Sequence, residues 1–256
     1  MSYFGTSNYY TDVVLGKVPG ASIVTVEGTG TVGTTYVPVS TALVYPTPTA
    51  AVSLEVVSSS ASDTSAGVGA RTVTITGLNA SWAEISQTVS MNGVTAVSIP
   101  TAMLRVYKVV VATSGTYASA TGGSHVGNIT VRVAGGGATW ATIDISTGFA
   151  EGRSAIGVYT IPLGSTGYLL SKVMSIETSK TADLRFFYRS AANTVAAPFS
   201  PMSQIEREGV VAGESIHTFV APIGPFVGPC DIGFMAKVSV GTALCEVEYQ
   251  LLITTP

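Results

Sequence analysis

The stretch formed by residues 58–111 constrains the fold most, because apolar and hydroxyl side chains alternate along it with a period of two. Residues 71–76 alternate threonine with valine and isoleucine, and residues 82–91 repeat the pattern after a turn at residues 77–80. Asn92-Gly93 is a dipeptide preferred in two-residue hairpin turns. Such alternation, interrupted by turn residues, predicts antiparallel strands with one buried face and one face in water.

The rest of the chain divides into three parts by its pattern. Residues 1–57 contain short apolar runs separated by Pro, Gly and Thr, which predicts an extended N-terminal arm. This segment can fold against a neighbour, add strands to the edge of the following domain, or form a flexible tail. Residues 58–147 predict a first β-sandwich and residues 148–256 a second, jelly-roll-like one. The predicted fold class is all-β: two antiparallel β-sandwich domains with an extended N-terminal arm.

The predicted strands of the second domain are defined by β-branched and aromatic residues. They are residues 155–161, 166–178, 181–189, 217–220, 231–238 and 243–253. Residues 222–229 hold three prolines and predict a loop, and residues 201–208 allow a short helical turn. A hairpin between the last two strands would place Cys245 near Ala236 and about 20 Å from Cys230. We therefore expect two free buried thiols and no disulfide.

Composition excludes several classes of partner. The net charge is −3 and the basic residues form no stripe that could follow phosphates, so we expect no direct contact with nucleic acid. No apolar run has the length of a membrane span, and residues 1–5 do not begin a secretion signal, so we expect synthesis in a cytosol. Charged residues make up only 11% of the chain. Either neighbours cover much of the surface, or hydroxyls replace the usual charges.

No arrangement of residues predicts catalysis, a cofactor or a metal. The only histidines are His125, expected in a solvated loop, and His217, expected at a strand start, too few for a His-based site. Asp63 lies among hydroxyls, and we interpret it as a turn cap and not as a calcium ligand. The glycines in residues 67–69 and 135–137 lack the strand, helix and lysine of a phosphate-binding loop. We therefore expect a protein that is not an enzyme.

The remaining polar and aromatic candidates have structural interpretations. Asp183 and Arg185 can pair along one strand face, and residues 206–208 are expected to be a solvated charge cluster. Asn79 and Asn128 begin glycosylation patterns that we interpret as accidental without a signal peptide. The two tryptophans, Trp82 and Trp140, can stack on sugars, but core packing is the preferred interpretation.

Several stretches resemble a family of virion structural proteins of marine and cyanobacterial tailed phages. The resemblance covers most of residues 58–256 and is carried by residues 58–79, 84–97, 104–106, 128–131, 158–169, 182–185 and 230–232, with a further match at residues 18–21. Leu163-Gly164-Ser165 stands where the family usually has Ala-Gly-Lys, and a tryptophan expected in the N-terminal arm is absent.

The resemblance implies a non-enzymatic component of a phage particle with no catalytic residues. We expect a capsid decoration or cement protein, located in the virion, whose partners are the major capsid protein and copies of itself. The alternatives are a tail, collar or fibre component, or a module that binds host-surface carbohydrate through exposed tryptophan or tyrosine. Copy number per particle separates the shell from the tail, and tryptophan fluorescence with host glycans tests the third alternative.

Overall fold

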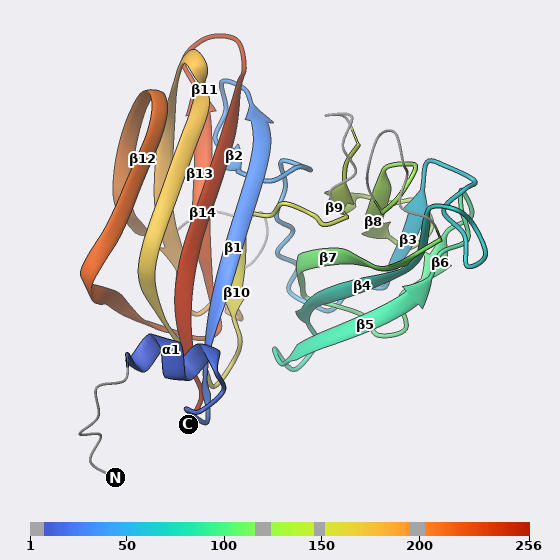
Figure 1. Ribbon diagram of the computed structural model, residues 1–256, viewed down its shortest axis with the longest axis horizontal. Helices are drawn as coiled ribbons and strands as arrows, with labels where there is room; N and C mark the ends of the chain where they lie inside the picture. The colour runs from blue at the N-terminus through green and yellow to red at the C-terminus, as the bar shows by residue number, and fades with distance from the viewer. Residues whose placement is uncertain (1–7, 116–123, 146–151, 195–202) are drawn as a thin grey trace.

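The computed structural model describes residues 8–115, 124–145, 152–194 and 203–256, and the chain there forms two β-rich lobes (Figure 1). The larger lobe contains one short helix and seven strands: α1 (Tyr9–Val14), β1 (Ala21–Val32), β2 (Val37–Pro38), β10 (Val158–Ile161), β11 (Thr166–Arg189), β12 (Ser203–Val227), β13 (Cys230–Val238) and β14 (Ala243–Thr254). The smaller lobe contains β3 (Leu54–Ser58), β4 (Ala70–Leu78), β5 (Glu84–Ser90), β6 (Val97–Ser98), β7 (Arg105–Ser114), β8 (Ile129–Val133) and β9 (Thr139–Ile143). Every strand pair is antiparallel, which confirms the all-β fold class.

The larger lobe is layered because its longest strand bends over at one end. The first half of β11 pairs with β14, and its second half, from residue 182, pairs with β13. Residues 177–180 form the bend, where Ser179 has a φ of 67°. β12 follows β11 through both layers, and β13 turns back into β14 at the same end (Figure 1). The two layers can therefore face each other across one core.

Aromatic side chains fill that core. The ring centroids of Phe186 and Phe234, on adjacent strands, lie 4.8 Å apart. Tyr249, from β14, lies 5.3 Å from the Phe186 ring, and its hydroxyl donates a 2.9 Å hydrogen bond to the Ile232 carbonyl. Each of these four side chains has at most a trace of exposed surface. The buried tyrosine therefore satisfies its one polar group inside the core, as burial requires.

Residues 21–38 are integrated into the larger lobe, so the prediction of an extended arm over residues 1–57 was wrong for this segment, while residues 1–7 lie outside the described residues. β1 pairs along its whole length with β14, from Ala21 opposite Thr254 to Val32 opposite Ala243. β2 pairs with β13, and β3 already belongs to the smaller lobe. One alternative was that this segment adds strands to the edge of the domain that follows it in sequence. β1 is an edge strand, but it joins the lobe formed by the C-terminal half of the chain. The pairing partner lies at the far end of the sequence, where local patterns carry no information about it.

The smaller lobe has two sheets, in the orders β6-β3-β8-β9 and β5-β4-β7. The predicted alternation in residues 71–76 is confirmed, because Val73 and Ile75 are fully buried while the threonines between them are half-exposed. The β4–β5 hairpin is confirmed as well. The prediction of a hairpin at Asn92-Gly93 was wrong. The chain turns there, but β6 crosses to the other sheet and pairs with β3. Only Gly93 of the dipeptide has a positive φ, so the two-residue hairpin turn does not form.

Three further expectations about the second half were wrong. The residues expected to form a loop at 222–229 and a helical turn at 201–208 lie largely in β12, a strand at the edge of the lobe, where proline is tolerated. The last two strands are not ladder partners, since Cys245 stands opposite Ile176 and Ala236 opposite Leu184. Both cysteines are nevertheless buried free thiols, as expected.

The smaller lobe is inserted between β2 and β10 of the larger one. Where the chain returns, Gly157 packs against Gly28 of β1 so closely that a Cβ atom on Gly28 would lie 2.5 Å from the Gly157 Cα. Only glycine permits this backbone approach.

The jelly-roll assignment of the larger lobe stays a prediction. Among the described residues, no helix is long and apolar enough to cross a membrane.

Candidate interaction site at the junction of the lobes

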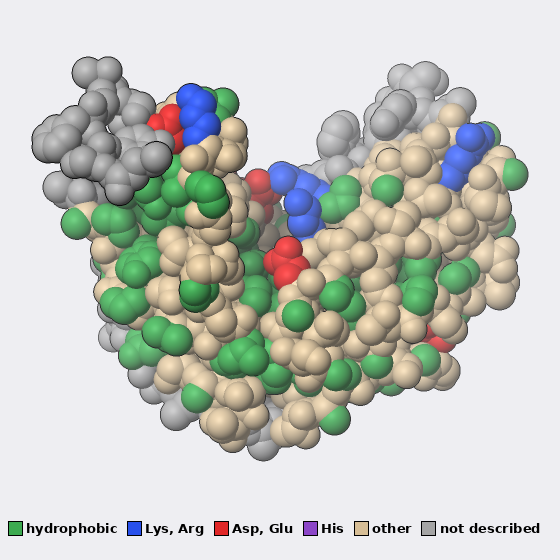
Figure 2. Space-filling model, turned by 90° about the horizontal axis from the view of Figure 1, so that it is seen from below, with side chains coloured by type: hydrophobic (Ala, Val, Ile, Leu, Met, Phe, Trp, Pro, Cys, Tyr) green, Lys and Arg blue, Asp and Glu red, His purple; other side chains and the backbone are tan. Residues whose placement is uncertain are grey.

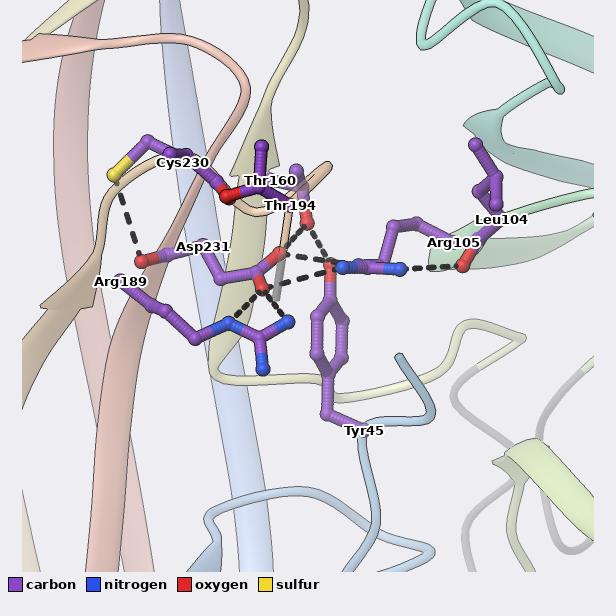
Figure 3. Close-up of polar contacts among 9 residues, drawn as sticks. Tyr45, Leu104, Arg105, Thr160, Arg189, Thr194, Cys230 and Asp231 are labelled. Carbon is purple, nitrogen blue, oxygen red and sulfur yellow. Dashed lines mark hydrogen bonds and ion pairs between the residues drawn. The ribbon is translucent and has the colours of Figure 1, made fainter. Parts of the chain in front are cut away.

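A buried charge cluster joins the two lobes at Asp231 (Figure 3). Arg105, at the start of β7 in the smaller lobe, donates from Nε and Nη2 to the two carboxylate oxygens at 3.1 and 3.3 Å. Arg189, at the end of β11, donates from Nε at 2.9 Å, and Thr160 of β10 donates its hydroxyl at 2.6 Å. All four side chains are essentially inaccessible to solvent. One carboxylate therefore holds residues from both lobes.

The cluster extends on both sides of the carboxylate. The Tyr45 hydroxyl lies 2.6 Å from the Thr160 hydroxyl, and burial raises the pKa of Tyr45 well above its ordinary value. On the other side, Arg105 donates to the Leu104 carbonyl at 2.9 Å, and its guanidinium lies 4.9 Å from the centre of the Trp82 ring. Two arginines share one carboxylate. Because the cluster is closed to solvent, we interpret it as a lock between the lobes.

Beside this lock, the surface is hollowed into a cleft of about 510 Å³. One wall is the edge strand β1, from Ile23 to Glu27, and the other is the outer face of the β5–β4–β7 sheet. Figure 2 shows this hollow from below, with acidic and basic side chains gathered beside it. The other lining residues are Thr76, Glu84, Ser86, Tyr107, Lys108, Arg153, Ser154, Ile156 and Tyr159. Hydrogen-bonding groups and apolar groups thus share the lining.

Two tyrosines connect the smaller lobe to the larger one in this cleft. Tyr107 donates a 2.5 Å hydrogen bond to Glu84 Oε2, and Tyr159 reaches the same oxygen at 3.4 Å. Their ring centroids lie 4.6 Å apart, and both rings are almost entirely buried. Burial, with the neighbouring Glu84 carboxylate, raises the pKa of both phenols. The phenols therefore stay protonated as donors, and neither ring offers a face on which a ligand can stack.

The outer face of the β5–β4–β7 sheet is lined with paired hydroxyls. Three cross-strand pairs are hydrogen-bonded: Thr72–Thr113 at 2.6 Å, Thr74–Thr88 at 2.7 Å and Thr76–Ser86 at 2.8 Å. Each β4 threonine uses its hydroxyl on a neighbour in the same sheet. We call this surface, formed by these six residues, the hydroxyl face. It is polar without being charged, which agrees with the low content of charged residues in the chain.

Asp63 is a buried structural centre of the smaller lobe. Its Oδ1 accepts from the amides of Ala70 and Val126 at 2.8 and 2.9 Å. Its Oδ2 accepts from the Ser58 hydroxyl at 2.5 Å and the Gly127 amide at 2.9 Å. Asp63 therefore accepts backbone amides, but those of residues 70, 126 and 127 and not of its own turn, so it joins distant segments where the sequence predicted a local turn cap. Among the described residues, no group of three or more acidic, His or Cys side chains is arranged to hold a metal ion.

The histidines and charge pairs named from the sequence fall in separate places. His125 was expected in solvent but is buried, with its Nδ1 2.8 Å from the Gly127 carbonyl oxygen, because the loop folds under Asp63. His217 lies in β12, and its side chain is outside the described residues, as are those of residues 206–208. Asp183 and Arg185 form the expected ion pair, at 3.6 Å.

Sequence reasoning identified the tryptophans as core residues and missed the lock. Trp140 is buried, and Trp82 is half-buried against the core and Arg105. Arg105 and Asp231 are far apart in sequence, and each lies next to ordinary strand residues. A charged residue within an apolar strand was the one available signal, since such a residue requires a buried partner.

No family model, curated protein or solved structure matches this chain.

Proposed function

We propose that this chain is a non-enzymatic structural protein of a phage particle, a decoration or cement protein that bridges major capsid subunits. The hydroxyl face is the observation that supports this proposal. The six side chains of this face are uncharged and already hydrogen-bonded to one another, so covering them with a neighbour desolvates no charge. The exposed Lys108, opposite Thr76, lies at the edge of this face. The resemblance of residues 58–111 to phage virion proteins concerns this same sheet.

The lock at Asp231 supports the proposal in a second way. A protein that bridges subunits must keep its contact surfaces at fixed relative positions, and buried ion pairs with good geometry favour one arrangement of the groups they join. Two rigid lobes can then contact adjacent subunits together. Repetition of weak contacts over a shell supplies the total affinity through effective concentration.

The first experiment is the copy number of this chain in purified particles, measured by quantitative mass spectrometry against the major capsid protein. A shell protein is expected at a near-equal or simple fractional ratio. A ratio of a few per cent would reject the shell and favour a tail, collar or fibre position. Absence from particles would reject the virion role altogether.

A surface variant then tests the role of the hydroxyl face. Thr74→Lys puts a charge at the centre of that face, and particles are expected to incorporate this variant at least tenfold less than the wild type. Thr242→Lys, at an exposed turn of the larger lobe, is the matched control that should be incorporated normally. Equal incorporation of the two variants would show that the hydroxyl face does not contact the particle.

A further inference from the structure

The backbone of β1 presents unused hydrogen-bonding groups to the cleft. Ala21 stands opposite Thr254 with no shift of register along β1, and the Thr255 amide donates to the Gly20 carbonyl at 2.6 Å. Bonded and non-bonded pairs alternate in an antiparallel ladder. Even-numbered residues of β1 therefore bond to β14, and odd-numbered residues direct their N–H and C=O groups away from it.

The odd-numbered residues in the cleft are Ile23, Thr25 and Glu27. Within the described part of the chain, no other backbone or side-chain group forms a hydrogen bond with their outward amides and carbonyls. All five residues from 23 to 27 line the cleft, although successive side chains of a strand point to opposite faces. A cavity that contacts both faces in this way runs along the edge of the strand. The edge is thus open where the cleft is.

We propose that the cleft binds an extended polypeptide segment of a partner protein, which adds to β1 as an antiparallel or parallel strand. A strand is the ligand whose repeating donors and acceptors match an open edge. The open run is about 16 Å long, enough to oppose about five residues of the segment. The opposite wall includes Thr76 and Ser86, the two residues of the hydroxyl face that line the cleft, and their side chains can contact a passing strand. This partner class goes beyond the proposed function and does not depend on it.

The charges of the cleft define the segment further. Glu27 pairs with Arg153, and Glu84 accepts the two phenols. Lys108 is exposed and forms no ion pair with any described residue. The segment is therefore expected to carry an aspartate or glutamate opposite Lys108. A sugar is a poorer match, because Tyr107 and Tyr159 offer no exposed ring for stacking.

The test uses the purified full chain and a displayed library of random twelve-residue peptides. The variant Thr25→Pro removes one outward amide and leaves the bonds to β14 in place, as proline permits at an edge. Thr29→Pro is the matched control, since Thr29 has the same outward parity but lies beyond the cleft lining. Selected peptides are expected to be acidic, and to bind the wild type and Thr29→Pro equally and Thr25→Pro at least tenfold more weakly. Lys108→Gln should weaken binding several-fold.

Two further measurements distinguish strand addition from a folding defect of the variant. Hydrogen exchange by NMR should show fast amides at Ile23, Thr25 and Glu27 in the free wild type, which become protected when a selected peptide binds. A peptide with alternate amides N-methylated should lose binding to the unaltered protein. The proposal is overturned if the library yields no binder, if binding to Thr25→Pro is within twofold of wild type, or if none of the three amides becomes protected.

Discussion

Asp231→Asn should destabilise this protein far more than removal of one of its arginine partners. The carboxylate contacts two buried guanidinium groups and the Thr160 hydroxyl, and all of these side chains are closed to solvent. Removing one partner of a buried pair costs about 3–5 kcal/mol, because the other charge stays buried without compensation. Asp231→Asn removes the carboxylate from two buried guanidinium groups at once, so we expect the upper end of that range or more.

Arg105→Met is the informative comparison. This change leaves Asp231 with Arg189, a pair with no net charge, and an apolar chain of similar length against Trp82. It loses the hydrogen bonds from Arg105 to Asp231 and to the Leu104 carbonyl. Asp231 keeps its ion pair with Arg189 and its hydrogen bond from Thr160, so no carboxylate is left buried without a partner, which is the main source of the larger cost. We therefore expect a loss of about 2 kcal/mol or less.

Urea denaturation at pH 7, followed by circular dichroism and tryptophan fluorescence, measures both variants. In thermal melts a loss of 1 kcal/mol corresponds to about 2–4 °C for a chain of this size, so Asp231→Asn should melt about 10 °C or more below the wild type. Glu246→Gln is the control, because its hydrogen bond from the Ser175 hydroxyl is exposed and its loss should change stability by less than about 1 kcal/mol. A cost for Asp231→Asn no larger than that for Arg105→Met would refute the reasoning.

Three other changes follow from buried or hydrogen-bonded groups. Asp63→Asn places an amide, which has two N–H donors, where a carboxylate accepts from four donors. We expect the free energy of unfolding, measured by urea denaturation, to fall by about 2–4 kcal/mol. An unchanged urea midpoint would show that these four hydrogen bonds do not stabilise the fold. The amide of Gly135, followed by Arg132, lowers the pKa of Glu55 below its ordinary 4.5, so its contribution to stability is present above about pH 4.5 and is lost as the pH falls through the folded-state pKa. Glu55→Gln should accordingly narrow the difference in stability between pH 7 and pH 3, and an identical pH profile would exclude this contribution. Burial raises the pKa of Cys230 to about 12 and that of Cys245 to about 11, so neither thiol should react with Ellman's reagent at pH 8 until urea unfolds the chain; rapid labelling of the native protein would show that they are accessible.

The parts of the fold that could be predicted from the sequence are those held by neighbours along the chain. Alternation in residues 71–76 placed Val73 and Ile75 inside, and the β4–β5 hairpin followed from a short turn. Each of these features is set by residues within about ten positions of one another. At Asn92-Gly93 the local pattern predicted a turn correctly but the pairing of the next strand wrongly. After this turn the chain crosses to the other sheet, where β6 pairs with β3.

The junction could not be predicted because its parts come from distant segments. β1 pairs with β14, and the lock brings Arg105 to Asp231 from opposite halves of the chain. A charged residue in a strand signals that a partner is needed, but not which residue it is. The cleft has no sequence signature at all, since its main element is the outward backbone of β1, which any residues can supply.

The insertion of the smaller lobe has a consequence for the order in which the protein is made. β3 to β9 form a contiguous stretch, so a ribosome delivers the whole smaller lobe before β10 emerges. β1, synthesised earlier, must wait for its partner strand β14, and Arg105 must wait for Asp231, which follows it by 126 residues at the start of β13. Folding during synthesis therefore produces a stage with one nearly finished lobe, an Arg105 side chain without its carboxylate partner, and a β1 strand without the strand that it pairs with. Completion of the C-terminal strands resolves all of these together.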